Sequence, residues 1–227
     1  MNQPVLLDTR DTAELGSFPN VTEWLSAISY LGAKALVVLG PDPFGDPDER
    51  DVFCVYPESH AEAASSLCQS GGYGRSWRES RSPLVAWSNL TANDDTPPWN
   101  WMDRWIKNGM ASMVRVELPL PMSRSFECFI FGDEEIRDRS QAADICYAMM
   151  SAWPILKEEI TTSKLGISER ERESLAAAAD GLTAKETALR MQCTERTVTH
   201  HWTNAMRKMQ TRNKVAAVQR ASWLGLI

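Results

Sequence analysis

The most informative stretch of the sequence is residues 183–209, TAKETALRMQCTERTVTHHWTNAMRKM. It contains two helix starts, a capping box from Thr183 to Glu186 and an N-cap at Thr194. In a capping box, the first hydroxyl and the fourth carboxylate each bond a free backbone N–H at the helix end. Because only a turn of about three residues separates the two helices, the stretch predicts a helix-turn-helix arrangement.

The second helix of this pair has two chemically different sides. Its apolar residues recur at helical spacing and predict one buried stripe, formed by Val198, Trp202, Ala205 and Met209. Its other side carries charged and short polar side chains, which suit the edges of bases in a major groove. The side chains that we predict to contact bases or nearby phosphates are Glu195, Arg196, Thr199, His200, Thr203 and Arg207.

Further candidates for phosphate contacts surround this helix pair. Thr183 and Lys185 stand at a helix N-terminus, where backbone N–H groups and the helix dipole favour a phosphate. Lys208, Arg212 and Lys214 are additional basic candidates. The alternative is that these side chains are only the solvated faces of small helices, but the basic excess, the tight turn and the cap spacing together favour nucleic acid.

Two more short helices flank the pair. A capping box at Ser168–Glu171 precedes an alanine-rich run that ends at Gly181, and Asn213 is placed to cap a last helix. Residues 161–227 are therefore predicted to be an all-α domain of four helices.

Charge is distributed unequally along the 227 residues. The overall net charge of -6 by itself argues against nucleic-acid binding. Residues 1–160 hold 13 basic and 24 acidic side chains, a net charge of -11, whereas residues 161–227 hold 11 basic and 6 acidic side chains, a net charge of +5. This asymmetry indicates that the C-terminal part meets an anion.

The first 160 residues are predicted to be a separate domain of mixed α and β structure. The predicted strands are 35–39, 51–56, 113–120 and 126–131, and the predicted helices are 20–31, 58–69 and 134–156. The expected fold class is α+β, with an N-terminal α/β/α sandwich around an antiparallel sheet. The polar residues 157–166 are expected to link it to the helical domain.

Several classes of protein are excluded by the sequence. No apolar run approaches the ~18 residues that span a bilayer, and the N-terminus lacks the pattern of a secretory signal, so we expect a cytoplasmic protein with no membrane partner. The five cysteines are scattered without a C-x-x-C pair, which predicts reduced thiols and no metal site. Because the sequence contains no G-x-S-x-G, phosphate-binding glycine loop or H-E-x-x-H, we expect no catalytic residues and no enzyme.

Residues 167–227 resemble the C-terminal DNA-binding domain of LuxR-type transcription regulators almost end to end. The resemblance is carried by R-E-x-E at 170–173, D-G-x-T-x-K-E at 180–186 and R-T-V at 196–198. Trp202 stands where the family usually has Leu, and Ala205 where it has a larger aliphatic, which fits a volume-conserving change in one core. The resemblance implies a homodimer on a pseudo-palindromic operator in double-stranded DNA.

The N-terminal domain resembles, more weakly, the autoinducer-binding domains of the quorum-sensing branch of this family, which bind acyl-homoserine lactones and dimerise. Ser82 stands where that branch has the Asp that accepts the ligand's amide N–H, and Gln69 where it has a Trp. Since a carboxylate accepts a hydrogen bond about twice as strongly as a neutral group, we do not expect a standard lactone to bind in the usual way. A different small ligand, an altered binding mode and no ligand remain open.

Aromatic residues supply most of the candidate ligand site. The chain has nine tryptophans, and a cluster of four lies between residues 87 and 105. Such a cluster either lines an apolar pocket or forms an aromatic core or dimer surface, and both interpretations stay open. The candidate ligand-binding residues are Tyr56, Tyr73, Ser82, Trp87, Trp99 and Trp101.

The sequence thus predicts a DNA-binding transcription regulator of the LuxR type that senses a small signal molecule and needs no cofactor. The domains are expected at residues 1–160 and 161–227. The alternative is a ligand-independent regulator or anti-activator that heterodimerises with a LuxR-type receptor or another protein partner. The absence of the family's Asp and Trp favours this alternative.

Overall fold

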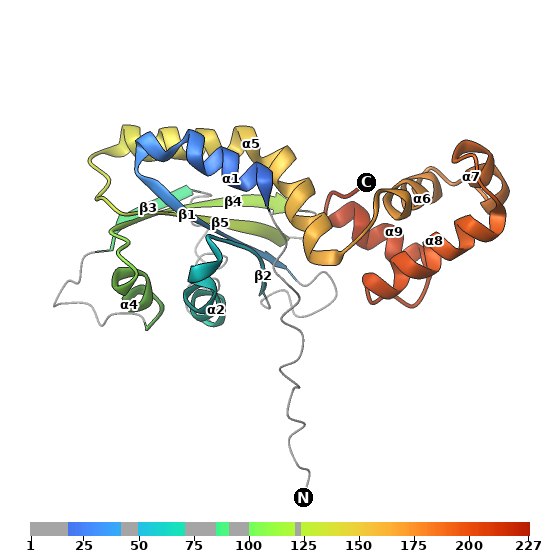
Figure 1. Cartoon of the computed structure of the whole chain (residues 1–227), viewed down its shortest axis with the longest axis horizontal. Helices are drawn as coiled ribbons and strands as arrows, with labels where there is room; N and C mark the ends of the chain where they lie inside the picture. The colour runs from blue at the N-terminus through green and yellow to red at the C-terminus, as the bar shows by residue number, and fades with distance from the viewer. Residues whose placement is uncertain (1–17, 42–49, 71–84, 91–99, 121–123) are drawn as a thin grey trace, which may run out of the picture.

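The computed structural model describes residues 18–41, 50–70, 85–90, 100–120 and 124–227, which form one sheet with helices on both faces and a separate group of helices (Figure 1). The strands are β1 Ala33–Pro41, β2 Arg50–Tyr56, β3 Val85–Asn89, β4 Ser112–Leu120 and β5 Arg124–Gly132. The helices are α1 Pro19–Ala27, α2 Ala61–Gln69, α4 Asn100–Lys107, α5 Arg139–Leu165, α6 Glu169–Ala179, α7 Ala184–Arg190, α8 Glu195–Lys208 and α9 Lys214–Trp223, with 3-10 turns at Ser29–Leu31 and Glu58–His60.

The five strands lie in the order β2-β1-β5-β4-β3, and every neighbouring pair is antiparallel. In the β4–β5 pair, Val116 stands opposite Cys128 and Leu118 opposite Phe126. Since opposite residues of a ladder share a face, this register places these four side chains on one face of the sheet, and it confirms the two predicted strands.

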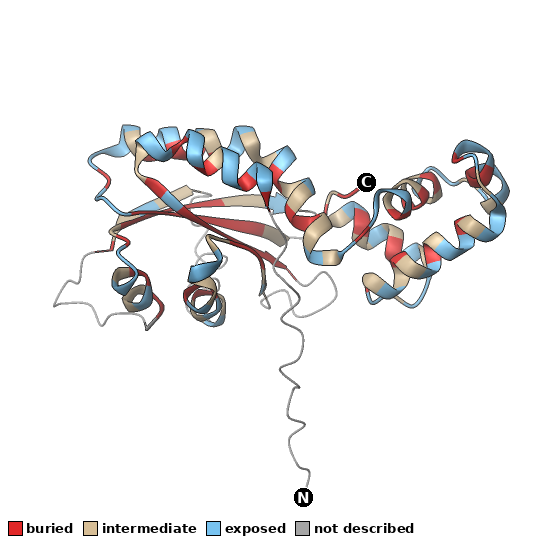
Figure 2. Ribbon diagram, viewed as in Figure 1, coloured by how far each residue is buried: buried red, intermediate tan, exposed pale blue. Residues whose placement is uncertain are grey.

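Two helical layers cover the sheet. α1 and α5 lie over one face, whereas α2 and α4 lie over the other, which we call the α2/α4 face (Figure 1). Figure 2 shows the buried strands between the partly exposed helices of both layers. Sheet residues buried on the α1/α5 side include Leu36, Val38, Val114, Val116, Phe126, Cys128 and Ile130, and those on the α2/α4 face include Ala35, Val37, Leu39, Met113, Phe129 and Phe131. The predicted α/β/α sandwich is therefore confirmed.

α5 differs from the prediction at its C-terminal end. The polar composition of residues 157–166 suggested a linker, but α5 continues to Leu165. Leu156 and Ile160 are 1% and 0% exposed and give this end of the helix a buried side that composition alone did not reveal. Gly166 then ends the helix with a left-handed φ of 61°, a conformation that glycine adopts without a steric penalty.

β3 and α4 correspond to no element of the sequence prediction. The end of β3 is held from far along the chain, because the Asn89 Oδ1 accepts from the Ile136 N–H at 2.8 Å. α4 is placed by burial, since Trp101 and Trp105 are 1% and 0% exposed against the α2/α4 face. Both elements are held by contacts with residues that are distant in the sequence, so the local sequence did not indicate them.

The four C-terminal helices begin at the capping residues that the sequence indicated. The side chains of Ser168, Thr183, Thr194 and Asn213 each accept a hydrogen bond from a backbone N–H of the helix that follows. In both predicted capping boxes, the glutamate carboxylate in turn accepts a hydrogen bond from the backbone N–H of the capping residue. The all-α C-terminal part of the predicted fold is confirmed.

Candidate DNA-binding surface

The turn between α7 and α8 occupies residues 191–193, as predicted. Gln192 has a left-handed φ of 55°, and the Cys193 N–H donates to the Ala188 carbonyl at 3.0 Å, which closes the end of α7. The Thr194 Oγ1 accepts from the Thr197 N–H at 3.1 Å and starts α8. These bonds fix α7 and α8 as a helix-turn-helix unit.

One side of α8 is fixed in the core of the C-terminal domain. Val198, Ala205 and Met209 are fully buried, and Trp202 is 9% exposed. The indole N–H of Trp202 donates to the Ser174 carbonyl of α6 at 2.9 Å. A buried aromatic ring with its polar group satisfied is a strong anchor, so α8 has one orientation with respect to α6.

The other side of α8 is open. All six residues predicted to contact bases or phosphates are exposed: Glu195, Arg196, Thr199, His200, Thr203 and Arg207. The Thr199 Oγ1 donates to the Glu195 carbonyl and the Thr203 Oγ1 to the Thr199 carbonyl, both at 2.9 Å. Because these bonds use the hydroxyl protons inside the helix, each threonine presents acceptor lone pairs and a methyl group to a partner.

The structure adds one residue that the sequence analysis missed. The Asn204 Nδ2 lies 3.0 Å from the His200 Nε2, one helical turn away. This contact holds the imidazole beside the exposed side of α8. The spacing of four residues between His200 and Asn204 was the available sequence signal.

The start of α7 carries its own negative charge. The Glu186 carboxylate accepts from the Thr183 N–H at 2.8 Å and from its Oγ1 at 2.7 Å, and these two bonds hold the pKa of Glu186 below its ordinary value. The backbone donors expected to attract a phosphate are thus partly satisfied. Lys185 is exposed beside them and is the group able to reach an anion there.

Two predicted phosphate contacts are engaged within the domain. The Lys208 ammonium donates to the Glu171 carboxylate at 2.7 Å, and the Lys214 ammonium lies 4.2 Å from the centre of the Trp202 ring. Arg212 is exposed. Lys208 and Lys214 are therefore less available to an external anion than the exposed Arg196 and Arg207.

The structure does not bring together the described members of the predicted ligand site. Trp101 is buried on the α2/α4 face, whereas Tyr56 packs against the opposite core and Trp87 is 40% exposed beside α5. Tyr73, Ser82 and Trp99 lie outside the described residues. In the described part, the aromatic residues form core and surface on two different sides of the sheet.

The α2/α4 face is occupied by large side chains. The rings of Trp105 and Phe131 stack with centroids 3.6 Å apart and planes 6° apart, and both residues are fully buried. Met113 and Phe129, 1% and 0% exposed, pack in the same cluster.

A buried ion cluster continues this face. The Glu127 carboxylate accepts from the Arg115 Nε and from the Arg50 Nη1, both at 3.0 Å. The Arg115 Nη2 also donates to Glu117 at 2.9 Å. Arg115 and Glu127 are 1% and 4% exposed. The sequence analysis did not predict this cluster, because Glu127 on β5 and Arg50 on β2 are far from Arg115 in the sequence.

Neither a metal site nor a membrane span emerges from the described residues. Among them, no three His, Cys, Asp or Glu side chains gather closely enough to hold a metal ion. No helix that the structure describes is long and apolar enough to cross a bilayer.

The geometry defines a class of protein domain, a helix-turn-helix domain with an open polar recognition side. Residues 166–221 match the family described as bacterial regulatory proteins, luxR family. The C-terminal helical domain is therefore similar to that of LuxR-type regulators. The matched family is one of regulatory proteins, which agrees with the expectation of a regulator.

Individual relatives match parts of the chain. AnoR, a transcriptional activator protein of Acinetobacter nosocomialis, is 41% identical over 69 residues, which cover 30% of this chain and 29% of AnoR. RhlR, an HTH-type quorum-sensing regulator of Pseudomonas aeruginosa, is 28% identical over 166 residues, 64% of this chain and 63% of RhlR. The chain thus spans less than two thirds of the length of either relative. The crystal structure of Escherichia coli SdiA is similar over 94% of this chain and 93% of its own, with 21% identity and a TM-score of 0.42.

Proposed function

We propose that the protein is a DNA-binding transcription regulator that acts as a homodimer in the bacterial cytoplasm on a pseudo-palindromic duplex site. The observation that carries the proposal is the open side of α8, where six charged or polar side chains are exposed on a helix anchored by Trp202. The net charge of +5 over residues 161–227 supports it, because DNA affinity arises largely from phosphate neutralisation.

In the proposed complex, α8 enters the major groove and its exposed side faces the bases. Thr199 and Thr203 contact base edges as acceptors, and Glu195 accepts from a cytosine amino group. Arg196, His200 and Arg207 reach bases or flanking phosphates, and Lys185 adds a phosphate contact from α7. Thr183, Lys208 and Lys214 contribute less, because their polar groups already have partners within the domain.

The proposed dimer is supported by an apolar patch between β3 and α5. Trp87, Tyr147 and Met150 are 40%, 75% and 56% exposed and line one hollow together with Val85, Ala142, Ala143 and Cys146. Large apolar side chains that gather on a surface mark a contact site. Pairing two copies across this patch buries them and gives the two-fold symmetry that a pseudo-palindrome requires.

The N-terminal domain has two candidate roles. The first is to sense a small signal molecule, other than a standard acyl-homoserine lactone, in line with the family resemblance. The second is a ligand-independent role, as a regulator or as an anti-activator that pairs with another protein. The stacked Trp105 and Phe131 and the buried Arg115–Glu127 pair favour the second role, because they fill the described part of the α2/α4 face without a ligand.

Selection from a random duplex library tests the DNA-binding function. The full-length protein is expected to enrich two related half-sites in inverted orientation, and a nuclease footprint is expected to cover both. An unenriched library at physiological salt would overturn the proposal.

A thermal melt separates the two roles of the N-terminal domain. A ligand that binds only the folded state raises the melting temperature. The protein is melted with and without acyl-homoserine lactones of several chain lengths and, separately, with and without an organic extract of bacterial culture, and the mass of the purified species is measured. A soluble chain that binds its DNA and melts at one temperature throughout supports the ligand-independent role, and co-purification of a second chain supports heterodimerisation.

A further inference from the structure

The connection between the two parts of the chain is very short. α5 ends at Leu165, and Ser168 is already the N-cap of α6. Between them stand only Gly166, which ends α5 in the left-handed conformation, and Ile167, which is 3% exposed. A buried residue in a connection this short gives the helical domain little freedom to turn about the sheet domain.

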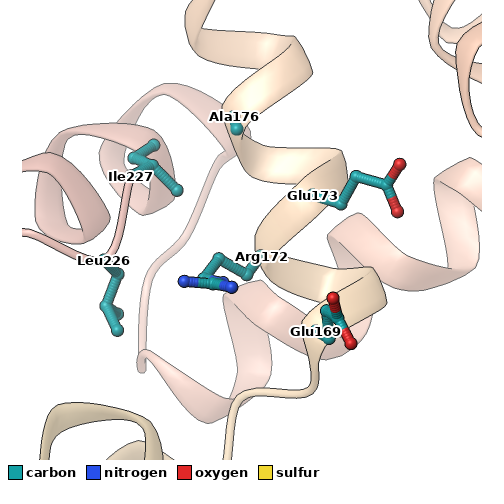
Figure 3. Close-up of a pocket in the computed structure, with 6 residues that line it drawn as sticks. All are labelled: Glu169, Arg172, Glu173, Ala176, Leu226 and Ile227. Carbon is teal, nitrogen blue, oxygen red and sulfur yellow. The ribbon is translucent and has the colours of Figure 1, made fainter. Parts of the chain in front are cut away.

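Side chains from both parts meet across this connection. The Arg172 guanidinium of α6 pairs with the Glu158 carboxylate of α5. The end of the chain folds back beside α5, where a Cβ added to Gly225 would collide with the Lys157 ammonium and lie 2.9 Å from its Cε. Figure 3 shows Arg172 pointing toward Leu226 across the hollow between α6 and the end of the chain.

The end of α5 is also anchored to the sheet. The Lys164 ammonium lies 2.8 Å from the Asp51 carboxylate of β2 and 5.8 Å from the centre of the Phe53 ring. Buried residues of α5, of the sheet and of the helical domain form one continuous apolar cluster that includes Ile160, Ile167 and Leu226. α8 is therefore held at a fixed position with respect to the sheet through α6 and α5.

We propose that the α5–α6 junction sets the spacing and rotational phase of the two half-sites that the dimer reads. This inference rests on the proposed function, because it needs two copies on one duplex. One added base pair moves a half-site by about 3.4 Å along the duplex and by about 35° around it. A fixed junction cannot follow such a displacement, whereas two domains on loose tethers can.

The test uses the full-length protein and the half-sites found by library selection. Duplexes carry these half-sites with the central spacer lengthened by one, five or ten base pairs, and dissociation constants are measured by fluorescence anisotropy. The wild-type protein is expected to lose affinity on all three lengthened duplexes, by about 100-fold or more on the five- and ten-pair duplexes, because only one half-site remains in reach. A variant with six Gly/Ser residues inserted between Gly166 and Ile167 is expected to bind the ten-pair duplex at least tenfold more tightly than the wild type does.

A charge exchange tests the ion pair itself. Glu158→Arg places two cations together and is expected to broaden the range of accepted spacers, whereas Glu158→Arg combined with Arg172→Glu restores the narrow range. Arg170→Ala is the matched control, because it breaks an exposed pair with Glu173 within α6 alone.

Three results are distinguishable. Wild-type binding that is equal on all spacers, with a footprint over both half-sites, would overturn the fixed junction while leaving the dimeric regulator intact. Equal binding with a footprint over a single half-site would overturn the dimer. Binding to none of the duplexes would overturn the DNA-binding function.

Discussion

The open side of α8 and the α2/α4 face of the sheet both carry arginine and glutamate, but they leave these charges in opposite states. On α8, Glu195, Arg196 and Arg207 are exposed. On the α2/α4 face, Arg115 and Glu127 are almost completely buried and bonded to each other. Exposed arginines without a bonded carboxylate can bind an external anion. A buried ion pair instead contributes to the stability of the fold, and removing one partner destabilises it.

The largest expected effect concerns the buried cluster. Glu127→Ala leaves Arg50 and Arg115 without the carboxylate that each one bonds at 3.0 Å. Breaking a buried pair by removing one partner typically costs roughly 3–5 kcal/mol. We expect a loss of this size in the free energy of unfolding, measured by urea denaturation.

Glu62→Ala is the matched control for that measurement. Glu62 pairs with Arg104 at the surface, where its side chain is 83% exposed, and an exposed pair contributes about 0–1 kcal/mol. Equal losses of unfolding free energy for Glu127→Ala and Glu62→Ala would contradict the distinction between buried and exposed ion pairs.

The next effect concerns the open charges of the DNA-binding domain. Replacing both Arg196 and Lys185 by Ala is expected to weaken binding to all duplexes on the order of tenfold or more, and to lower the salt dependence by about one unit of slope for each lost phosphate contact. Binding constants at several salt concentrations check this, with the thermal melt unchanged. Lys107→Ala, which removes one positive charge from α4 in the N-terminal domain, is the control. Binding that survives the double substitution at physiological salt would count against the proposed complex.

The two domains also differ in how much of their structure could be predicted from the sequence. The helices of the C-terminal domain start at residues whose partners lie three positions away, such as Ser168 with Glu171 and Thr183 with Glu186. Such contacts join residues that are close in the sequence, so the sequence alone predicts them. The apolar stripe of α8 likewise follows from one helical period, so the buried Val198 and the exposed Thr199 were both predicted correctly.

The N-terminal domain depends on contacts between distant residues. Trp87 and Trp101 are close in sequence, but the pairing of β3 with β4 and the packing of α4 place them on opposite sides of the sheet. Glu127 meets Arg50, which is 77 residues away. The sequence indicated a cluster of tryptophans, but it could not show which rings pack together. Its polar composition also predicted a linker where the structure has the partly buried end of α5.

A smaller effect is expected from pH in the C-terminal domain. Burial alone would raise the pKa of Glu171, but hydrogen bonds from Lys208 and from the Ser168 N–H outweigh it, so the pKa lies below its ordinary value. A depressed carboxyl pKa stabilises the fold above the unfolded value of about 4.3, and this contribution is lost as the pH falls through the lower, folded value. Urea unfolding across this acidic range is expected to show a steeper loss for wild type than for Glu171→Gln. Glu169→Gln, at an exposed neighbouring position, should follow the wild type.

The smallest expected effect separates recognition of specific bases from electrostatic attraction to the phosphates. Thr199→Ala removes no charge, and its hydroxyl proton is bonded to the Glu195 carbonyl, so neither the salt dependence nor the fold should change appreciably. What disappears is an acceptor and a methyl group on the open side of α8, which together distinguish an adenine or cytosine amino group and a thymine methyl from the other base edges. Library selection is expected to show a preference reduced by about 1 kcal/mol at one position of each half-site, with affinity for random duplex unchanged. Thr199→Ser keeps the acceptor and loses the methyl, so a preference restored by serine assigns the recognition to the hydroxyl. If alanine and wild type select identical sequences, Thr199 does not face a base, and the open side of α8 acts through charge alone.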